Sequence, residues 1–480
     1  MVNPSKQCII SLLREHLQVA CVSSSYHHFS RFAIDLMDVA SLESSVEATL
    51  DALRGDQWRA RQPFTIFRVP ANVRESNRTS YEPRVVSIGP YYHGGAALRT
   101  MEDHKWHYLQ GLLSRHAGDG SVAAVSASTL VAEMRTLEAQ ARACYSERPA
   151  GLASDDFIVM LLLDGCFILE FLLKWHAKEP DALCDAGRGL TLVPAAADLL
   201  LMENQIPFFV LERLYGAVTG GGAQHGRESL LHLFVKYLGS EDEEPMRWPS
   251  GDWEVHHLLH LYYQSFIPNR TPPRSRRGPR SDRRTITRTP RVIPCATEMR
   301  EAGVQFVAAQ SPAAAAGGTR YDVAFDARWG VMEIPTVLID DARRPLLANL
   351  LAFEQSQRGE EEGLLSSYVA LMSQLIVTAR DVELLRRRGV VVNLLDNDEE
   401  AARFFNRLDD CHPAGYDSQA FSGLYDDVTR YCGTWWHSHM AGLRRNYFPS
   451  PWSAISVAVA TFVIALAATQ TYFTVFPPNK

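Results

Sequence analysis

Two carboxyl groups lie inside strongly apolar runs of this sequence. Asp164 lies within FIVMLLLDGCFILEFLL, and Glu203 lies within DLLLMENQIPFFV. Burial raises the pKa of a carboxyl group, and a carboxyl that titrates near neutral pH can act as a general acid or base. The alternative is a satisfied polar contact that fixes helix register, with Asn204 and Gln205 as partners. We favour the contact, because the chain contains no G-x-S-x-G nucleophile motif.

Three histidines form a second candidate site. His256 and His260 are four residues apart and share one face of a predicted helix, with His257 between them. A zinc-protease motif, H-E-x-x-H, requires glutamate directly after the first histidine, where this chain has His257. We therefore interpret all three as ordinary helix-surface histidines and predict no metal site.

The remaining short motifs of metal and cofactor sites are incomplete. The acidic run Asp396, Asp398 and Glu400 is not followed by the glycine that an EF-hand loop requires. The glycines at 89–95 do not form G-x-G-x-x-G, and no stretch matches the phosphate-binding P-loop pattern. We predict no catalytic residue and no cofactor.

Charge and cysteine content narrow the class of protein further. Eight cysteines are scattered without any C-x-x-C pair, which favours reduced thiols over zinc sites or a disulfide framework. The net charge of −7 over 480 residues gives no general electrostatic case for a nucleic-acid partner. Residues 269–291 are the exception, since they carry nine arginines interrupted by prolines and serines. This composition predicts a disordered insertion.

The carboxyl-terminal residues 452–476 contain no charged residue and no histidine. As a helix rising about 1.5 Å per residue, this stretch would be roughly 37 Å long, which exceeds the roughly 30 Å hydrocarbon core of a bilayer. The sequence therefore predicts a single-pass transmembrane helix. Its expected anchor residues are Trp452, Ile455, Val459, Phe462, Ile464, Leu466, Phe473 and Phe476.

The flanks of this stretch predict the topology of the anchor. Arg444 and Arg445 precede it and only Lys480 follows it, which favours a cytosolic amino-terminal head. The short apolar run at 8–13 does not resemble a secretory signal. The predicted location is therefore a membrane, either the plasma membrane or an endomembrane.

Small residues recur along one face of the same stretch. Ser453, Ala460 and Ala467 are spaced every seven residues, and such a stripe lets helices approach closely in lipid. A homodimer through the membrane helix is one arrangement that this stripe permits. The expected partners are thus the lipid bilayer, a second copy and an unidentified protein.

Hydrophobic spacing predicts a mainly α-helical head. We expect a helical lead-in at 1–62, a head at 63–445 and the membrane helix at 452–476. A break is expected at Pro207, and alternation on either side of Gly330 predicts a small β-hairpin within 321–339. Ser154 or Asp155 and Asn397 with Asp398 are the predicted helix caps. Helices are expected at 101–116, 155–173, 198–215, 230–238, 256–266, 346–353, 367–388 and 398–408.

A series of colinear blocks resembles the plant family called domain of unknown function 247. The blocks include YEPRVVSIGPYYHGG, MEDHKWHYL, DDFIVMLLLDGCFILEFLL, DLLLMENQIPFFVLERLY and MEIPTVLIDD. The resemblance implies an α-helical head, a terminal membrane helix and no established catalytic activity. The residues that carry the signature are Arg68, Pro70, Tyr81, Pro83, Gly89, Pro90, Gly94, His104, Lys105, Asp164, Glu203, Asn204 and Pro207.

The resemblance and the predicted anchor together indicate a non-enzymatic protein. We expect it to act in protein recognition or signalling at a membrane. Because grass members of the family are implicated in self-incompatibility, the resemblance also implies a role as a pollen-side determinant. Two alternatives are a hydrolase that uses Asp164 or Glu203, and a nucleic-acid binder that uses residues 269–291.

Overall fold

The computed structural model divides the chain into two units, Met1–Pro63 and Phe64–Lys480. In the first unit, residues 42–48 are helical and exposed. The predicted arginine-rich insertion at 269–291 lies outside the described residues. The residues that the structure describes are 42–48, 50, 64–116, 125–149, 151–180, 195–220, 223–239, 254–266, 292–309, 319, 321–357, 363–411, 420–434 and 451–475.

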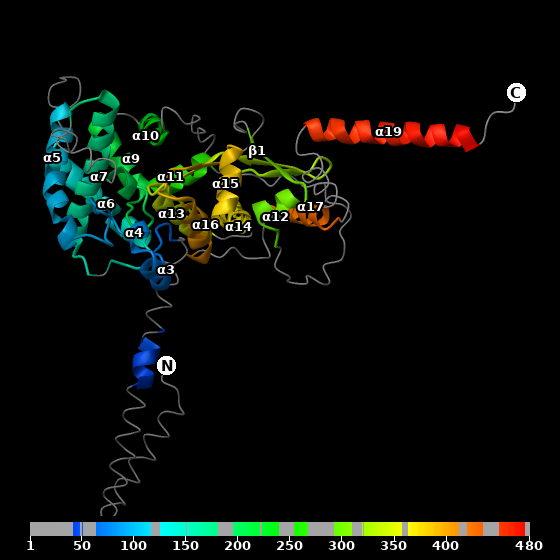
Figure 1. The fold of residues 1–480 in the computed structure, drawn as a ribbon. Coiled ribbons are helices and arrows are strands. Elements are labelled where there is room, and N and C mark those ends of the chain that lie inside the picture. The colour runs from blue at the N-terminus through cyan, green and yellow to red at the C-terminus, as the bar shows by residue number, and fades with distance from the viewer. Residues whose placement is uncertain are drawn as a thin grey trace, which may run out of the picture. The chain divides into compact units, whose positions relative to one another are not determined.

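Helices form most of the described part of the second unit, which confirms the mainly α-helical prediction (Figure 1). Most of the long ones follow the predicted spacing of apolar residues. They are α3 (Ala71–Ser76), α4 (Arg78–Tyr81), η1 (Ala96–Leu98), α5 (Arg99–His116), α6 (Ala127–Ala143), α7 (Ser154–Ala177), α9 (Phe208–Thr219), α10 (Ala223–Leu238), α11 (Leu258–Phe266), α12 (Ala296–Glu301), α13 (Arg343–Ser356), α14 (Leu364–Leu375), α15 (Ala379–Arg387), α16 (Asp398–Cys411), α17 (Ser422–Cys432) and α19 (Pro451–Val475).

Two small sheets accompany the helices. In the first, strand order is β1-β3-β2: β3 pairs antiparallel with β2 and parallel with β1. The β2–β3 pair, joined through Gly330, confirms the predicted hairpin. In the second, β4 pairs parallel with β5, a pairing that was not predicted. The strands are β1 (Gln305–Ala309), β2 (Ala324–Asp326), β3 (Val331–Pro335), β4 (Val337–Ile339) and β5 (Val391–Asn393).

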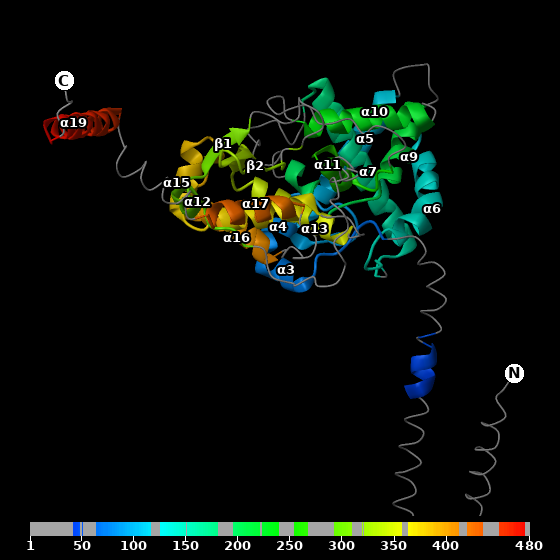
Figure 2. The ribbon, with the colours of Figure 1, turned by 90° about the vertical axis from the view of Figure 1, so that its right-hand side faces the viewer.

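Helix α7 is the centre of one hydrophobic cluster. It contacts α5, α6, α9 and α10, and these helices lie together in both ribbon views (Figures 1 and 2). Nearly every side chain from Phe157 to Leu172 is buried, on all faces of the helix. The all-round apolar sequence is therefore explained by burial among four neighbouring helices.

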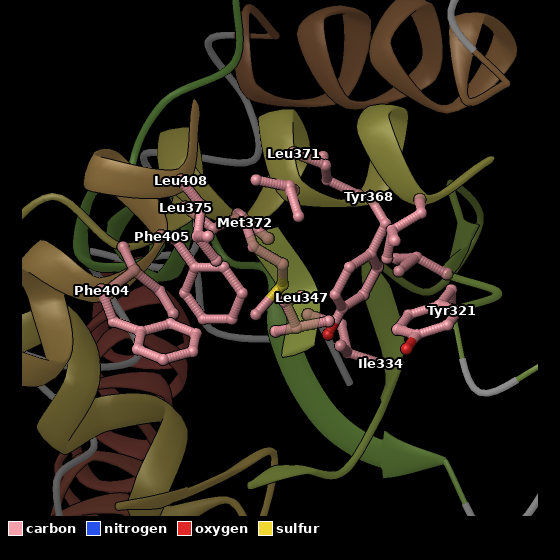
Figure 3. Packing of buried hydrophobic residues seen from close by; sticks show 14 of the residues in the cluster. Tyr321, Ile334, Leu347, Tyr368, Leu371, Met372, Leu375, Phe404, Phe405 and Leu408 are labelled. Atoms are coloured by element: carbon pink, nitrogen blue, oxygen red, sulfur yellow. The ribbon is translucent and has the colours of Figure 1, made fainter. Parts of the chain in front are cut away.

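A second hydrophobic cluster lies between α13, α14, α16 and the three-stranded sheet (Figure 3). Tyr368 of α14 is central to it: its ring packs edge-on against Tyr321 at 5.1 Å and against Phe405 at 6.4 Å between centroids. Aromatic pairs prefer this edge-to-face geometry. The cluster fixes the inner face of the sheet, where Met332 and Ile334 are fully buried.

Helix ends agree with the sequence in some places and differ in others. Pro207 directly precedes α9, as predicted, and the Asn397 side chain accepts a hydrogen bond from the Glu400 N–H at 2.7 Å, as expected of a cap. The cap prediction for α7 is wrong. Its N-cap is Ala153, and the Ser154 hydroxyl instead donates to Glu138 of α6 at 2.6 Å.

The predicted helix at 367–388 is divided into α14 and α15. Thr378 adopts an extended conformation between them, and its hydroxyl and N–H both donate to Asp381. The Asp381 carboxylate also accepts two hydrogen bonds from Thr297. Burial works against ionisation, but these donors outweigh it and lower the pKa of Asp381. A capping box therefore replaces the continuous helix.

The prediction of a membrane-spanning helix is wrong. Although α19 is helical, no helix within the described residues is both long enough and apolar enough to cross a bilayer. The single-pass membrane location predicted from this helix is not supported either. The lipid partner and the membrane homodimer stay predictions.

The proposed anchor residues can be placed individually. The side chains of Ile455, Val459, Phe462, Ile464 and Leu466 are exposed. Phe476 and the side chains of Trp452 and Phe473 lie outside the described part of the chain.

Candidate functional site

The signature residues gather around a segment without regular secondary structure, residues 84–89, that belongs to neither sheet. The buried carboxylate of Asp198 accepts hydrogen bonds from the N–H groups of Arg84, Val85 and Val86 at 3.0, 2.7 and 2.9 Å. Burial raises the pKa of Asp198, and the three N–H donors oppose this rise. The Asp198 side chain thus accepts the backbone hydrogen bonds that a neighbouring β-strand would accept in a sheet.

Asn204 continues this pairing along the segment. Its side-chain oxygen accepts from Ile88 N at 2.7 Å, and its amide nitrogen donates to the carbonyls of Val86 and Asp198. Gln205 stabilises the turn at 198–206, because its side-chain amide nitrogen donates hydrogen bonds to two carbonyls within that turn. From residue 199 on, the turn at 198–206 is neither helix nor strand, so the first part of the helix predicted at 198–215 is wrong.

Asp164 holds the end of the segment from the centre of α7. One carboxylate oxygen accepts from Gly89 N at 2.7 Å, and the other accepts from Lys105 Nζ at 2.5 Å. Lys105 also donates to the Ser87 carbonyl and to Glu102, so all three of its protons are used. Burial raises the pKa of Asp164, although Lys105 opposes this. Burial also works to lower the pKa of Lys105, but the two carboxylates outweigh it and raise that pKa.

Glu203 forms a second buried acceptor on the other side of the turn. It accepts from Val69 N at 2.8 Å, from the Tyr92 hydroxyl at 2.7 Å and from Arg74 at 3.2 Å. Arg68 Nε lies 3.8 Å away. Glu203 therefore makes the polar contact that the sequence favoured, but with these residues and not with Asn204 or Gln205.

Gly89 lies where the segment meets the turn most closely. Its φ is +76°, and a Cβ added there would lie 2.3 Å from the carbonyl oxygen of Gln205. The Tyr145 hydroxyl donates to that same oxygen at 3.1 Å. Gly94 has the same φ, yet a Cβ there would meet nothing within 4 Å.

The structure thus brings many of the signature residues together. Those that make the network are Arg68, Gly89, Lys105, Asp164, Glu203 and Asn204. Pro70 and Pro207 precede α3 and α9, and Tyr81 and Pro90 are buried nearby. Pro83, Gly94 and His104 make none of the side-chain contacts described above.

Asp198, Arg74 and Tyr92 also belong to the network, although they are not among the predicted site residues. Asp198 alone left a signal, since it is an acidic residue directly before the apolar run LLLM. The other two lie in segments of ordinary polarity.

The three candidate histidines lie at the start of α11. His257 and His260 are buried, so the prediction of surface histidines is wrong for both. His257 Nε2 donates to the Thr65 carbonyl at 3.0 Å, and its Nδ1 accepts from His260 N at 3.2 Å. Nδ1 of His260 accepts from His256 N at 3.1 Å. Within the described residues, no three His, Cys, Asp or Glu side chains are placed to hold a metal ion.

A hollow on the outer face of α5 lies away from the buried carboxylates. It has a volume of about 300 Å³ and opens widely to solvent. It is lined by Trp106, Leu109, Gln110, Leu113 and Ser114. Neither Asp164 nor Glu203 lines it.

Comparison with known proteins agrees with the resemblance in the signature. A family model, DUF247, described as plant protein of unknown function, matches residues 66–466. The UPF0481 protein At3g47200 of Arabidopsis thaliana is 27% identical over 430 residues, which cover 85% of this chain and 86% of that protein. A second UPF0481 protein of the same plant, At3g02645, is 23% identical and covers 90% of this chain and 94% of its own length. No solved structure matches.

Replacing Gly89 by alanine should destabilise the fold far more than replacing Gly94. Both substitutions place a side chain at positive φ, which costs about 1–2 kcal/mol. Only Gly89→Ala also forces Gln205 away, which should add about 1–3 kcal/mol. Urea unfolding of the two variants measures the difference, and equal losses would show that the close approach at Gly89 does not matter.

Acid should weaken the fold through the histidines. Burial lowers the pKa of His257 to about 3 and also lowers that of His260. Both rings are therefore neutral when folded but gain a proton near pH 6.5 when unfolded, so stability falls as the pH drops below that value. Between pH 7.5 and 5.5 the free energy of unfolding should fall by about 1 kcal/mol for each ring. Urea titrations should show a shallower pH dependence in His257→Gln/His260→Gln; an unchanged dependence contradicts this.

Proposed function

Because this chain belongs to the DUF247 family of plant proteins of unknown function, we propose that it acts in protein recognition or signalling and not as an enzyme. The support comes from the division of its side chains between interior and surface. The groups with acid–base chemistry are enclosed, while large aromatic groups are exposed.

The enclosed carboxylates carry the proposal. Asp164 is 0% exposed and Glu203 is 1% exposed. Each carboxylate accepts hydrogen bonds from a backbone N–H group and from a cationic side chain of the same protein. A general acid or base must reach the proton that it transfers, directly or through one water. A substrate would have to separate α7 from residues 84–89 to reach Asp164. The hydrolase alternative therefore conflicts with this geometry.

The exposed aromatic residues support recognition. Trp106 on α5 is 54% exposed, and Trp329 between β2 and β3 is 66% exposed. Tryptophan is enriched among the residues that dominate binding energy in protein interfaces. Both lie on helix or hairpin structure that the hydrophobic clusters hold in place.

A role as a pollen-side self-incompatibility determinant is the finer form of this proposal. It is supported by the resemblance to the family, some of whose grass members are implicated in that process. Transcript confined to pollen is the expected result. Uniform transcript in leaf and root would contradict the finer proposal and leave the general one.

Substitution of Asp164 separates recognition from catalysis. Asp164→Asn leaves the Lys105 charge buried beside a neutral amide, so the free energy of unfolding should fall by about 3–5 kcal/mol. The matched control on the same helix is Asp155→Asn, which breaks an exposed pair with Arg135 and should cost about 0–1 kcal/mol.

Chemical unfolding gives the two stabilities, and a screen against ester, amide and glycoside substrates gives any turnover. Our proposal expects the loss of stability and no turnover by the wild-type protein. The proposal would be contradicted if the wild-type protein turned over a substrate and the Asp164→Asn variant did not, while both proteins unfolded at the same denaturant concentration.

A further inference from the structure

The tip of the β2–β3 hairpin presents an exposed aromatic residue together with a cation. Trp329 is 66% exposed, more than the other tryptophans whose side chains are described. The guanidinium carbon of Arg328 lies 5.2 Å from the centroid of the Trp329 ring. This cation–π contact holds the two side chains as one unit.

The backbone of this tip is fixed from within. One carboxylate oxygen of Asp326 accepts from Arg328 N at 2.8 Å and from Trp329 N at 3.3 Å, while Gly330 N donates to the Asp326 carbonyl. Gly330 has φ +64°, and an added Cβ would lie 2.2 Å from the Tyr431 hydroxyl. The tip is therefore already ordered before any partner binds, which reduces the entropy lost on binding.

The positive charge on the tip is available to a partner. Among the described residues the Arg328 guanidinium makes no ion pair, and Asp326 is already engaged by the two N–H groups. The Trp329 indole and the Arg328 guanidinium are therefore complementary to a partner surface that has an apolar pocket next to a carboxylate.

Strands β1 and β3 of the same sheet also present exposed side chains. In the register of the sheet, Gln305 lies opposite Val331, and Val307 lies opposite Glu333. Val307 is 45% exposed, and Glu333 is also exposed. This side of the sheet thus presents both an apolar and a charged side chain, and a protein segment of mixed composition can match such a surface.

We propose that Arg328 and Trp329 form the anchor by which this protein binds an acidic protein segment, one that places Asp or Glu beside an apolar side chain. This inference rests on the proposed recognition function and names the chemistry of the partner. Trp329 enters the apolar slot, and Arg328 pairs with the carboxylate at its edge.

Selection from a displayed library of random 16-residue peptides tests the proposal with the full-length chain as bait. Enriched peptides should carry Asp or Glu within a few residues of Leu, Phe or Trp. The tightest one is then synthesised and titrated against the wild-type chain and its variants by calorimetry. Circular dichroism and the melting temperature show whether each variant retains its fold.

Three variants separate the parts of the anchor. Trp329→Ala should weaken the peptide at least tenfold. Arg328→Met keeps the aliphatic stem but removes the charge, so it should weaken binding and also make it less dependent on salt. Trp175→Ala is the matched control, since it removes a partly exposed indole on α7 and should leave binding unchanged.

Each other outcome overturns the proposal in a distinct way. Peptides that bind Trp329→Ala as tightly as wild type, or that lose binding in Trp175→Ala, would place recognition elsewhere and leave the proposed function intact. Failure to enrich any peptide would contradict both. Sedimentation of the wild-type chain, but not Trp329→Ala, with phosphatidylcholine vesicles containing phosphatidylserine would assign the tip to lipid.

Discussion

The fold depends on buried carboxylate and amide side chains that replace a β-sheet partner for residues 84–89. Asp198, Asn204 and Asp164 together accept five backbone N–H groups of this segment. A buried N–H without an acceptor costs about 1–3 kcal/mol, so a segment without regular secondary structure in the interior needs such partners. Because the acceptors lie on α7 and on the turn at 198–206, the segment ties together parts of the chain that are far apart in sequence.

The same constraint encloses the two carboxylates that the sequence offered as acid–base candidates, Asp164 and Glu203. Lys105 and Asp164 neutralise each other in the interior, and the protons of Lys105 are divided among Asp164, Glu102 and a carbonyl. Glu203 is similarly surrounded by an N–H group, a hydroxyl and a guanidinium. These groups maintain the position of the backbone. On the surface, the hairpin tip at Trp329 combines exposure, a fixed backbone and the charge of Arg328.

Much of the fold followed from local patterns. The all-round apolar run of α7 indicated a central helix, Pro207 marked the start of α9, and the alternation around Gly330 indicated the hairpin. What failed depended on distant contacts. The β4–β5 pairing joins residues about fifty positions apart, and the burial of His257 is set by the Thr65 carbonyl. Neither leaves a periodic signal. The membrane helix predicted at 452–476 is wrong: the stretch lacks charge, but seven of its residues are Ser, Thr or Gln.

Buried side chains protect the backbone amides of residues 84–89 from solvent as a neighbouring β-strand would. Native-state hydrogen exchange measured amide by amide tests it directly. We predict that the amides of Val86, Ile88 and Gly89 exchange only when the unit Phe64–Lys480 unfolds as a whole. Their free energy of exchange should then equal that of amides in the middle of α7. Exchange of these amides at the rate of an exposed loop, while α7 remains protected, would contradict it.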